Sequence, residues 1–110
     1  MLFRSCIATG TSSRLPQLHE VATVAEQGYK GFEMTQWYGL LAPSKMSLER
    51  VERIEKEAMS ATRGKVVQEK LSQDTALAIG NTRTEFQTFI HQEQARWKPV
   101  IARAQIKPEG

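Results

Sequence analysis

The sequence predicts an α/β fold, in which short apolar segments with the character of strands alternate with amphipathic helices. Two observations favour this class. Short apolar runs are bounded by glycine, proline or hydroxyl residues, and longer stretches repeat apolar residues at helical spacing. The predicted order is strand, helix, strand, helix, helix, strand and a long C-terminal helix. With 110 residues, of which 40% are hydrophobic and 25% charged, the chain can form at most one small domain.

The first predicted strand covers residues 2–9 and leads into a loop of small and hydroxyl residues at 10–13. Ligands of open α/β sheets bind at the carboxyl ends of strands, where backbone N–H groups and small hydroxyls suit an anionic oxygen. The loop is therefore a candidate anion site, and a plain polar turn is the alternative. The strand contains the only cysteine, Cys6, which we interpret as a small buried hydrophobic residue because nothing beside it would activate a thiol.

A short helix is predicted to begin at Thr23, because Thr23 and Glu26 have the spacing of a capping box. Gly28 is predicted to end it after little more than one turn. The next strand is predicted at 37–43, where apolar residues are continuous up to Pro43. Continuous rather than alternating apolarity indicates burial on both faces of a parallel sheet.

Two helices are predicted after this strand. Ser47 is a suitable N-cap for the first and Gly64 a suitable end. The apolar residues at helical spacing in the first helix are Leu48, Val51, Ile54, Ala58 and Ala61. The second helix is predicted over residues 65–72.

A short apolar strand at 76–79 is predicted to precede the last helix. Thr82 and Glu85 form a second capping box, which opens that helix. Pro99 lacks a backbone N–H and is expected to bend it. The face expected to pack against the core consists of Phe86, Phe89, Ile90, Trp97, Val100, Ile101 and Ala104.

Charge and residue content argue against several function classes. The 15 Lys and Arg residues exceed the 12 Asp and Glu residues by only three and are spread along the chain, which argues against binding to nucleic acid. A single cysteine excludes an intrachain disulfide and a thiolate metal site. His19 and His91 are far apart in sequence and are expected to face solvent, and no catalytic motif accompanies them. We therefore expect no enzyme activity, no cofactor and no metal.

No segment is long and apolar enough to cross a membrane, and no secretory signal precedes the first strand. The chain as it stands is accordingly expected to remain in the cytoplasm, without direct insertion into a membrane.

Several spaced segments together resemble one protein family. They are Thr9, Arg14-Leu15-Pro16, Val21, Thr23, Glu26, Gly28, Trp37, Gly39 to Pro43, Arg96-Trp97, Val100-Ile101 and Ile106 to Glu109. In this order they resemble the C-terminal part of the solute-binding receptors of tripartite tricarboxylate transporters, the Bug family. One departure is that His19 and Ala22 stand where the family has prolines.

The resemblance implies a partial type II periplasmic-binding-protein fold, with residues 1–36 at the end of the second lobe and residues 37–110 completing the first lobe. The N-terminal part of the family fold is then absent from this chain. The family implies a periplasmic receptor without enzyme activity, which holds a small carboxylate in the cleft between lobes and passes it to membrane permease subunits. Citrate, dicarboxylates, acidic amino acids and aromatic acids are the solutes implied.

We expect two segments to lie at the mouth of that cleft, because both adjoin strand ends or the crossing between lobes. The residues are Thr9, Gly10, Thr11, Ser12, Gln36 and Trp37. The alternative is a truncated remnant or structural module that binds no ligand and self-associates, because sheet edges and apolar surface would be exposed without the missing part.

Overall fold

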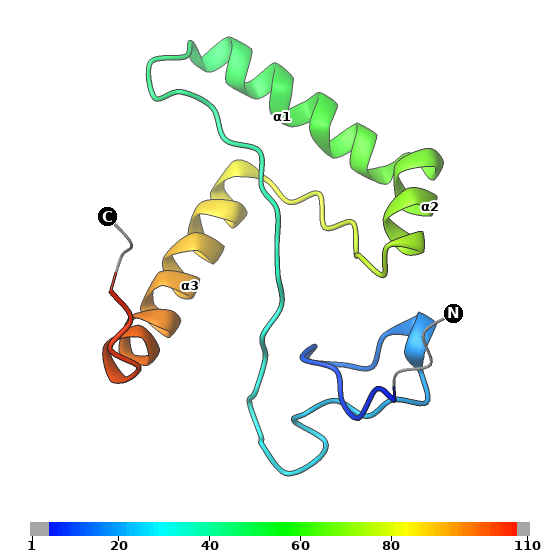
Figure 1. Ribbon diagram of the computed structural model, residues 1–110. Helices are drawn as coiled ribbons and strands as arrows, with labels where there is room; N and C mark the ends of the chain where they lie inside the picture. Colours follow the sequence, from blue (N-terminus) through cyan, green and yellow to red (C-terminus); the bar gives the residue numbers. More distant parts are fainter. Residues whose placement is uncertain (1–4, 108–110) are drawn as a thin grey trace. The chain divides into compact units, whose positions relative to one another are not determined.

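A computed structural model describes residues 5–107 of the chain (Figure 1). The chain divides into two units, Met1–Pro43 and Ser44–Gly110. The helices are the short 3-10 helix η1 (Pro16–Leu18) and the α-helices α1 (Leu48–Arg63), α2 (Lys65–Gln73) and α3 (Arg83–Arg103). Apart from η1, the regular secondary structure of the described residues therefore lies in the second unit.

The first unit is held by backbone hydrogen bonds between separate segments. Thr9 and Thr23 form an isolated parallel bridge, in which the Thr9 N–H donates to the Ala22 carbonyl at 3.1 Å and the Val24 N–H donates to the Thr9 carbonyl at 3.0 Å. Farther along the chain, the Met34 N–H donates to the carbonyl of Gly10 at 2.8 Å. Three segments thus meet around Thr9 and Thr23, which are the buried residues of the described chain, at 8% and 1% exposure.

The three predicted strands are wrong for the described part of the chain. In the first, residues 2–4 lie outside the described residues and only Thr9 makes a bridge. Segments 37–43 and 76–79 have no regular secondary structure, and Tyr38 and Ile79 are 89% and 74% exposed instead of buried. A strand forms only where a neighbour pairs with its backbone and covers its faces, and residues 5–107 supply no such neighbour to these segments.

The short helix predicted at Thr23 is also wrong, because consecutive turns occupy residues 24–28. Its capping box is nevertheless formed. The Thr23 N–H donates to Glu26 Oε2 at 2.8 Å, and the Glu26 N–H donates to Thr23 Oγ1 at 3.1 Å. Gly28 has a φ of +109°, which suits glycine and ends the turns as predicted. The stop comes too early for a helix to propagate beyond its costly first turn.

The helices of the second unit agree with the predictions. α1 follows Ser47 and ends at Gly64, and α2 follows directly. α3 begins after Thr82 with the predicted capping box, in which the Thr82 N–H donates to Glu85 Oε2 at 2.7 Å and the Glu85 N–H donates to Thr82 Oγ1 at 3.3 Å. The helix continues through Pro99 to its end at Arg103.

Contacts with α1 fix the start of α3. Glu55 Oε1 accepts a hydrogen bond of 2.6 Å from the N–H of Arg83, the first residue of α3. This carboxylate satisfies an N–H that has no partner inside the helix and complements the positive end of the helix dipole. Gly80 has a φ of +59°, and a Cβ there would lie 3.1 Å from Thr62 Cγ2, so a glycine permits this close approach to α1.

The described residues contain no buried hydrophobic side chain. On the predicted core face of α3, the side chains of Phe86, Phe89 and Trp97 are only partly covered, and Val100 is 46% exposed. Cys6, predicted to be buried, is exposed because the strand around it does not form. The helices therefore form without the apolar layer that their faces are suited to contact.

Candidate functional site

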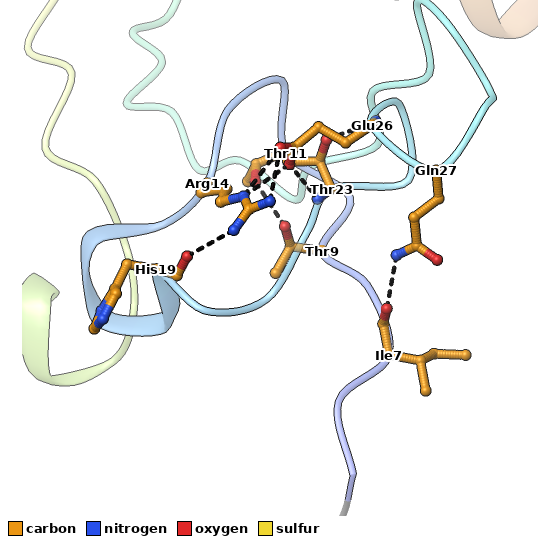
Figure 2. Close-up of polar contacts among 8 residues, drawn as sticks. All are labelled: Ile7, Thr9, Thr11, Arg14, His19, Thr23, Glu26 and Gln27. Atoms are coloured by element: carbon orange, nitrogen blue, oxygen red, sulfur yellow. Dashed lines mark hydrogen bonds and ion pairs between the residues drawn. The ribbon is translucent and has the colours of Figure 1, made fainter.

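The loop at 10–13 contains three of the predicted site residues and follows a fourth, Thr9, which forms the bridge with Thr23 (Figure 2). Its first glycine, Gly10, lies directly against the backbone of Met34. A Cβ at Gly10 would lie 2.6 Å from the Met34 carbonyl oxygen, so a larger residue would force the two segments apart. The loop is thus anchored at its start to two other parts of the first unit.

Hydroxyl groups of the loop bond to one another and to the loop backbone. Thr11 Oγ1 lies 2.6 Å from the Ser13 carbonyl oxygen and 3.2 Å from Thr9 Oγ1. The Thr11 hydroxyl has one hydrogen, which it gives to one of these two acceptors. The Thr11 side chain is therefore engaged inside the loop, contrary to the simple expectation that threonine hydroxyls would face an anion.

Unlike the Thr11 hydroxyl, backbone N–H groups of the loop have no acceptor among the described residues. Those of Gly10, Thr11 and Ser12 donate to no acceptor among residues 5–107. Gly10 and Thr11 are partly exposed and Ser12 is exposed, so solvent or a ligand can reach this stretch. Successive backbone N–H groups are the donors that form anion-binding concavities in loops. These three groups are what the loop can offer to a carboxylate.

The other two predicted site residues, Gln36 and Trp37, lie in the irregular segment that follows Met34. Gln36 Nε2 donates to the Tyr38 hydroxyl at 3.1 Å, and Trp37 is 43% exposed. A backbone contact between this segment and the loop is made by Met34 with Gly10. The structure thus brings the segment to the loop at a residue that the sequence does not single out.

An ion pair that the sequence analysis did not predict lies beside the loop (Figure 2). Arg14 Nε is 3.0 Å and 3.1 Å from the two carboxylate oxygens of Glu26, and Arg14 Nη2 is 3.0 Å from Glu26 Oε1. Arg14 Nη1 also donates to the His19 carbonyl at 3.1 Å. The capping-box spacing shows where the Glu26 carboxylate belongs, but no local pattern connects it with an arginine 12 residues earlier.

This ion pair also shifts the pKa values of Arg14 and Glu26. The hydrogen bond from Arg14 and that from the Thr23 N–H lower the pKa of Glu26 to about 2. In turn, the hydrogen bond and the negative charge of Glu26 raise the pKa of Arg14. Both groups are charged at neutral pH, and the negative charge of Glu26 neutralises the positive charge of Arg14.

The described residues do not provide other recognisable chemistry. No group of three or more His, Cys, Asp or Glu residues among them could hold a metal ion. His19 and His91 are both exposed, as expected. Within residues 5–107, no helix combines the length and the apolarity that a membrane span requires.

Three comparisons with known proteins point to the same family. Residues 3–106 match the family described as tripartite tricarboxylate transporter family receptor. The chain is 35% identical over 97 residues to the UPF0065 protein in the tcbD-tcbE intergenic region of Pseudomonas sp. (strain P51). The matched region covers 86% of this chain and 29% of that protein. It also matches the solved structure of R. palustris Rpa4515 with adipate, with a TM-score of 0.79, 28% identity, and coverage of 93% of this chain and 34% of that chain.

The chain therefore spans about a third of the length of the relatives that it matches. Its fold corresponds to one part of a binding-protein-like receptor, although the described residues lack the predicted strands. The resemblance found in the sequence is confirmed by the family match, the curated relative and the solved structure. The chain belongs to the tripartite tricarboxylate transporter receptor family, whose members are solute receptors and not enzymes.

Proposed function

We propose that this chain is the C-terminal part of a periplasmic receptor that captures a small carboxylate and passes it to membrane permease subunits. One observation carries this proposal: 93% of the chain matches part of a structure with adipate, a linear dicarboxylate, at a TM-score of 0.79. The family match over residues 3–106 supports the same role. The solute would be held in a cleft between two lobes, as the resemblance implies.

In the proposed receptor, residues 1–36 end the second lobe and residues 37–110 complete the first, in a type II binding-protein fold. Backbone hydrogen bonds that join Thr9 to Val24 and Gly10 to Met34 are consistent with one lobe for the first of these segments. The exposed apolar segments 37–43 and 76–79 become strands where the remaining part of the receptor supplies their neighbours. This explains why strand-like sequence occurs here without strands.

The proposed ligand contact is the stretch of backbone N–H groups at Gly10, Thr11 and Ser12. Hydrogen bonds from N–H groups to an ionised carboxylate are stronger than bonds between neutral groups. Three donors without partners among the described residues can replace water around one carboxylate. The exposed Trp37 ring would contact the apolar part of the solute, and Gln36 would complete the mouth of the cleft.

A chimaera would test this proposal. The present chain would replace the corresponding third of Rpa4515, and calorimetry would measure binding of adipate, succinate, citrate, glutamate and nicotinate. We expect at least one carboxylate to bind, and the uncharged analogue adipamide not to bind. A chimaera that unfolds cooperatively but binds none of these acids would contradict the proposal.

Proline variants of the chimaera would test the loop itself. Ser12→Pro removes one of the three N–H groups and is expected to weaken carboxylate binding by roughly tenfold, the loss of one charge-assisted hydrogen bond. Ser12→Ala is the matched control, because it changes the side chain of residue 12 and keeps its N–H. Equal binding by the two variants would place the carboxylate elsewhere.

A second candidate function is a self-associating structural module without a ligand. The supporting observation is that the described residues bury no hydrophobic side chain while Tyr38, Leu41 and Val66 are 89%, 77% and 81% exposed. Light scattering coupled to size-exclusion chromatography over a range of concentrations would test it. Concentration-dependent dimers or larger species favour the module, and a monomer at all concentrations argues against it.

A further inference from the structure

Arg14 and Glu26 connect both ends of the candidate ligand loop. At the start of the loop, Thr9 pairs with Thr23, and Glu26 follows Thr23 within the same capping box. At the end of the loop, Arg14 returns to the Glu26 carboxylate through contacts of 3.0 and 3.1 Å (Figure 2). The loop is therefore closed into a ring whose two ends meet at one carboxylate.

The geometry of the pair is specific. Two nitrogens of the Arg14 guanidinium face the two oxygens of Glu26, and a third nitrogen donates to the His19 carbonyl. A planar guanidinium provides several donors in a fixed arrangement, which a lysine cannot reproduce. Glu26 Oε2 also accepts the Thr23 N–H, so the carboxylate position is set from both sides. The pair thus defines the position of residue 14 relative to the bridge.

The exposure of the pair makes a large effect on stability unexpected. Both side chains are 45% exposed, and exposed ion pairs contribute little to the free energy of unfolding. The structural consequence of the pair is local, because its partners are the loop end, the η1 turn and the capping box. A local constraint of this kind acts on the conformation of residues 10–13.

We propose that Arg14 and Glu26 are positioning residues, which hold the N–H groups of Gly10, Thr11 and Ser12 in the arrangement that receives a carboxylate. This inference rests on the proposed function of the loop. The ring reduces the number of conformations that the free loop adopts, and preorganisation of this kind improves affinity because less order must be imposed on binding. The Glu26 carboxylate stays ionised at neutral pH, so the ring remains closed where the solute is charged.

A direct contact of Arg14 with the solute is the competing explanation. The nitrogens Nε, Nη1 and Nη2 already donate to Glu26 and to His19, and Glu26 balances the charge. If Arg14 bound the solute directly, Glu26→Gln would release the guanidinium and preserve or strengthen binding. If the pair positions the loop, Glu26→Gln and Arg14→Gln weaken binding alike, and the double variant is no weaker than either single variant.

The experiment uses the 110-residue chain, with adipate as the probe. Backbone order parameters of Gly10, Thr11 and Ser12 would be measured by NMR without ligand, followed by titration with adipate. The variants are Arg14→Gln, Glu26→Gln, their combination and the conservative Arg14→Lys. Lys65→Gln with Glu69→Gln is the matched control, because it removes an exposed ion pair of the second unit.

We expect both single variants to lower the order parameters of the loop, Arg14→Lys to restore them in part, and the control to leave them unchanged. Affinity for adipate is expected to fall roughly tenfold in each single variant and no further in the double variant. The melting temperature of the helices is expected to stay the same.

Unchanged loop order in Arg14→Gln and Glu26→Gln would overturn the positioning role, whether or not adipate binds. Binding to Glu26→Gln that is as tight as to the unsubstituted chain would also overturn it. Lowered loop order together with no response of the unsubstituted chain to adipate would support the positioning role and count against carboxylate binding by the loop in this chain. The two proposals therefore fail by different results.

Discussion

The two units of the chain differ in where their backbone hydrogen bonds go. In the second unit, α1, α2 and α3 satisfy most of their backbone groups within each helix. In the first unit, short-range bonds form turns, and other bonds join residues distant in sequence, such as Gly10 with Met34. Helices can therefore form in a chain that spans about a third of its relatives, whereas strands need partners from elsewhere in the fold.

The two capping boxes show the same difference on a small scale. Thr23 with Glu26 and Thr82 with Glu85 form the same reciprocal hydrogen bonds. The second box is followed by a helix of 21 residues, whereas the first is followed only by turns that end at Gly28. A capping box thus fixes the start of a turn, and the residues after it decide whether a helix follows.

The substitution expected to have the largest effect is Gly10→Val, in the first unit. A Cβ at Gly10 would lie 2.6 Å from the Met34 carbonyl oxygen, so the loop and the Met34 segment must separate. Overpacking of this kind costs about 1–3 kcal/mol. Amide hydrogen exchange is expected to show faster exchange at Met34 and Val24 and no change in the helices. Ser12→Ala is the control, and protection of Met34 equal to that in the control would contradict the prediction.

A smaller effect is expected in the second unit from Thr82→Ala. The substitution removes the side-chain acceptor at the start of α3 and is expected to cost about 1 kcal/mol. Thermal unfolding followed by circular dichroism would measure the loss. Thr88→Ala is the matched control, because Thr88 bonds to the Thr84 carbonyl inside the helix and caps nothing. Equal losses in both variants would show that the cap does not matter.

Acid is expected to break the Arg14–Glu26 ion pair of the first unit. The pKa of Glu26 is lowered from its ordinary value of 4.5 to about 2, so the pair contributes its full stabilisation above pH 4.5. That contribution is lost as the pH falls through about 2. NMR titration of the loop amides is expected to show this transition, and Glu26→Gln is expected to abolish it. The same transition in the Glu26→Gln variant would assign it to another group.

The smallest effect is expected from Lys65→Gln. Lys65 Nζ lies 3.6 Å from Glu69 Oε1, and the two side chains are 87% and 62% exposed. Such pairs on a helix surface contribute less than about 0.5 kcal/mol. Chemical denaturation is expected to give the same midpoint as the unsubstituted chain, and a clear shift would mean that this pair has a role beyond the helix surface.

Features that depend on near neighbours in sequence are predictable from the sequence. The starts of α1 and α3, the stop at Gly28 and both capping boxes follow from residues a few positions apart. The family can also be recognised from the sequence, because its matching segments extend from Thr9 to the C-terminal region.

Features that depend on distant residues are not predictable in this way. The segment at 37–43 has the composition of a buried strand, but burial requires a partner that residues 5–107 do not contain. Likewise, the contact of Gly10 with Met34 and the pair of Arg14 with Glu26 arise only when the turns of the first unit come together. The candidate loop can be predicted from the sequence, but its contacts with Met34 and the Arg14–Glu26 pair beside it cannot.

The most direct test of the account is a carboxylate titration followed at the backbone amides of Gly10, Thr11 and Ser12. In the chimaera with Rpa4515, we expect a bound carboxylate to shift these three amide signals together, and adipamide to leave them unchanged. Carboxylate binding that leaves all three signals in place would contradict the account, because the solute would then be held by other groups.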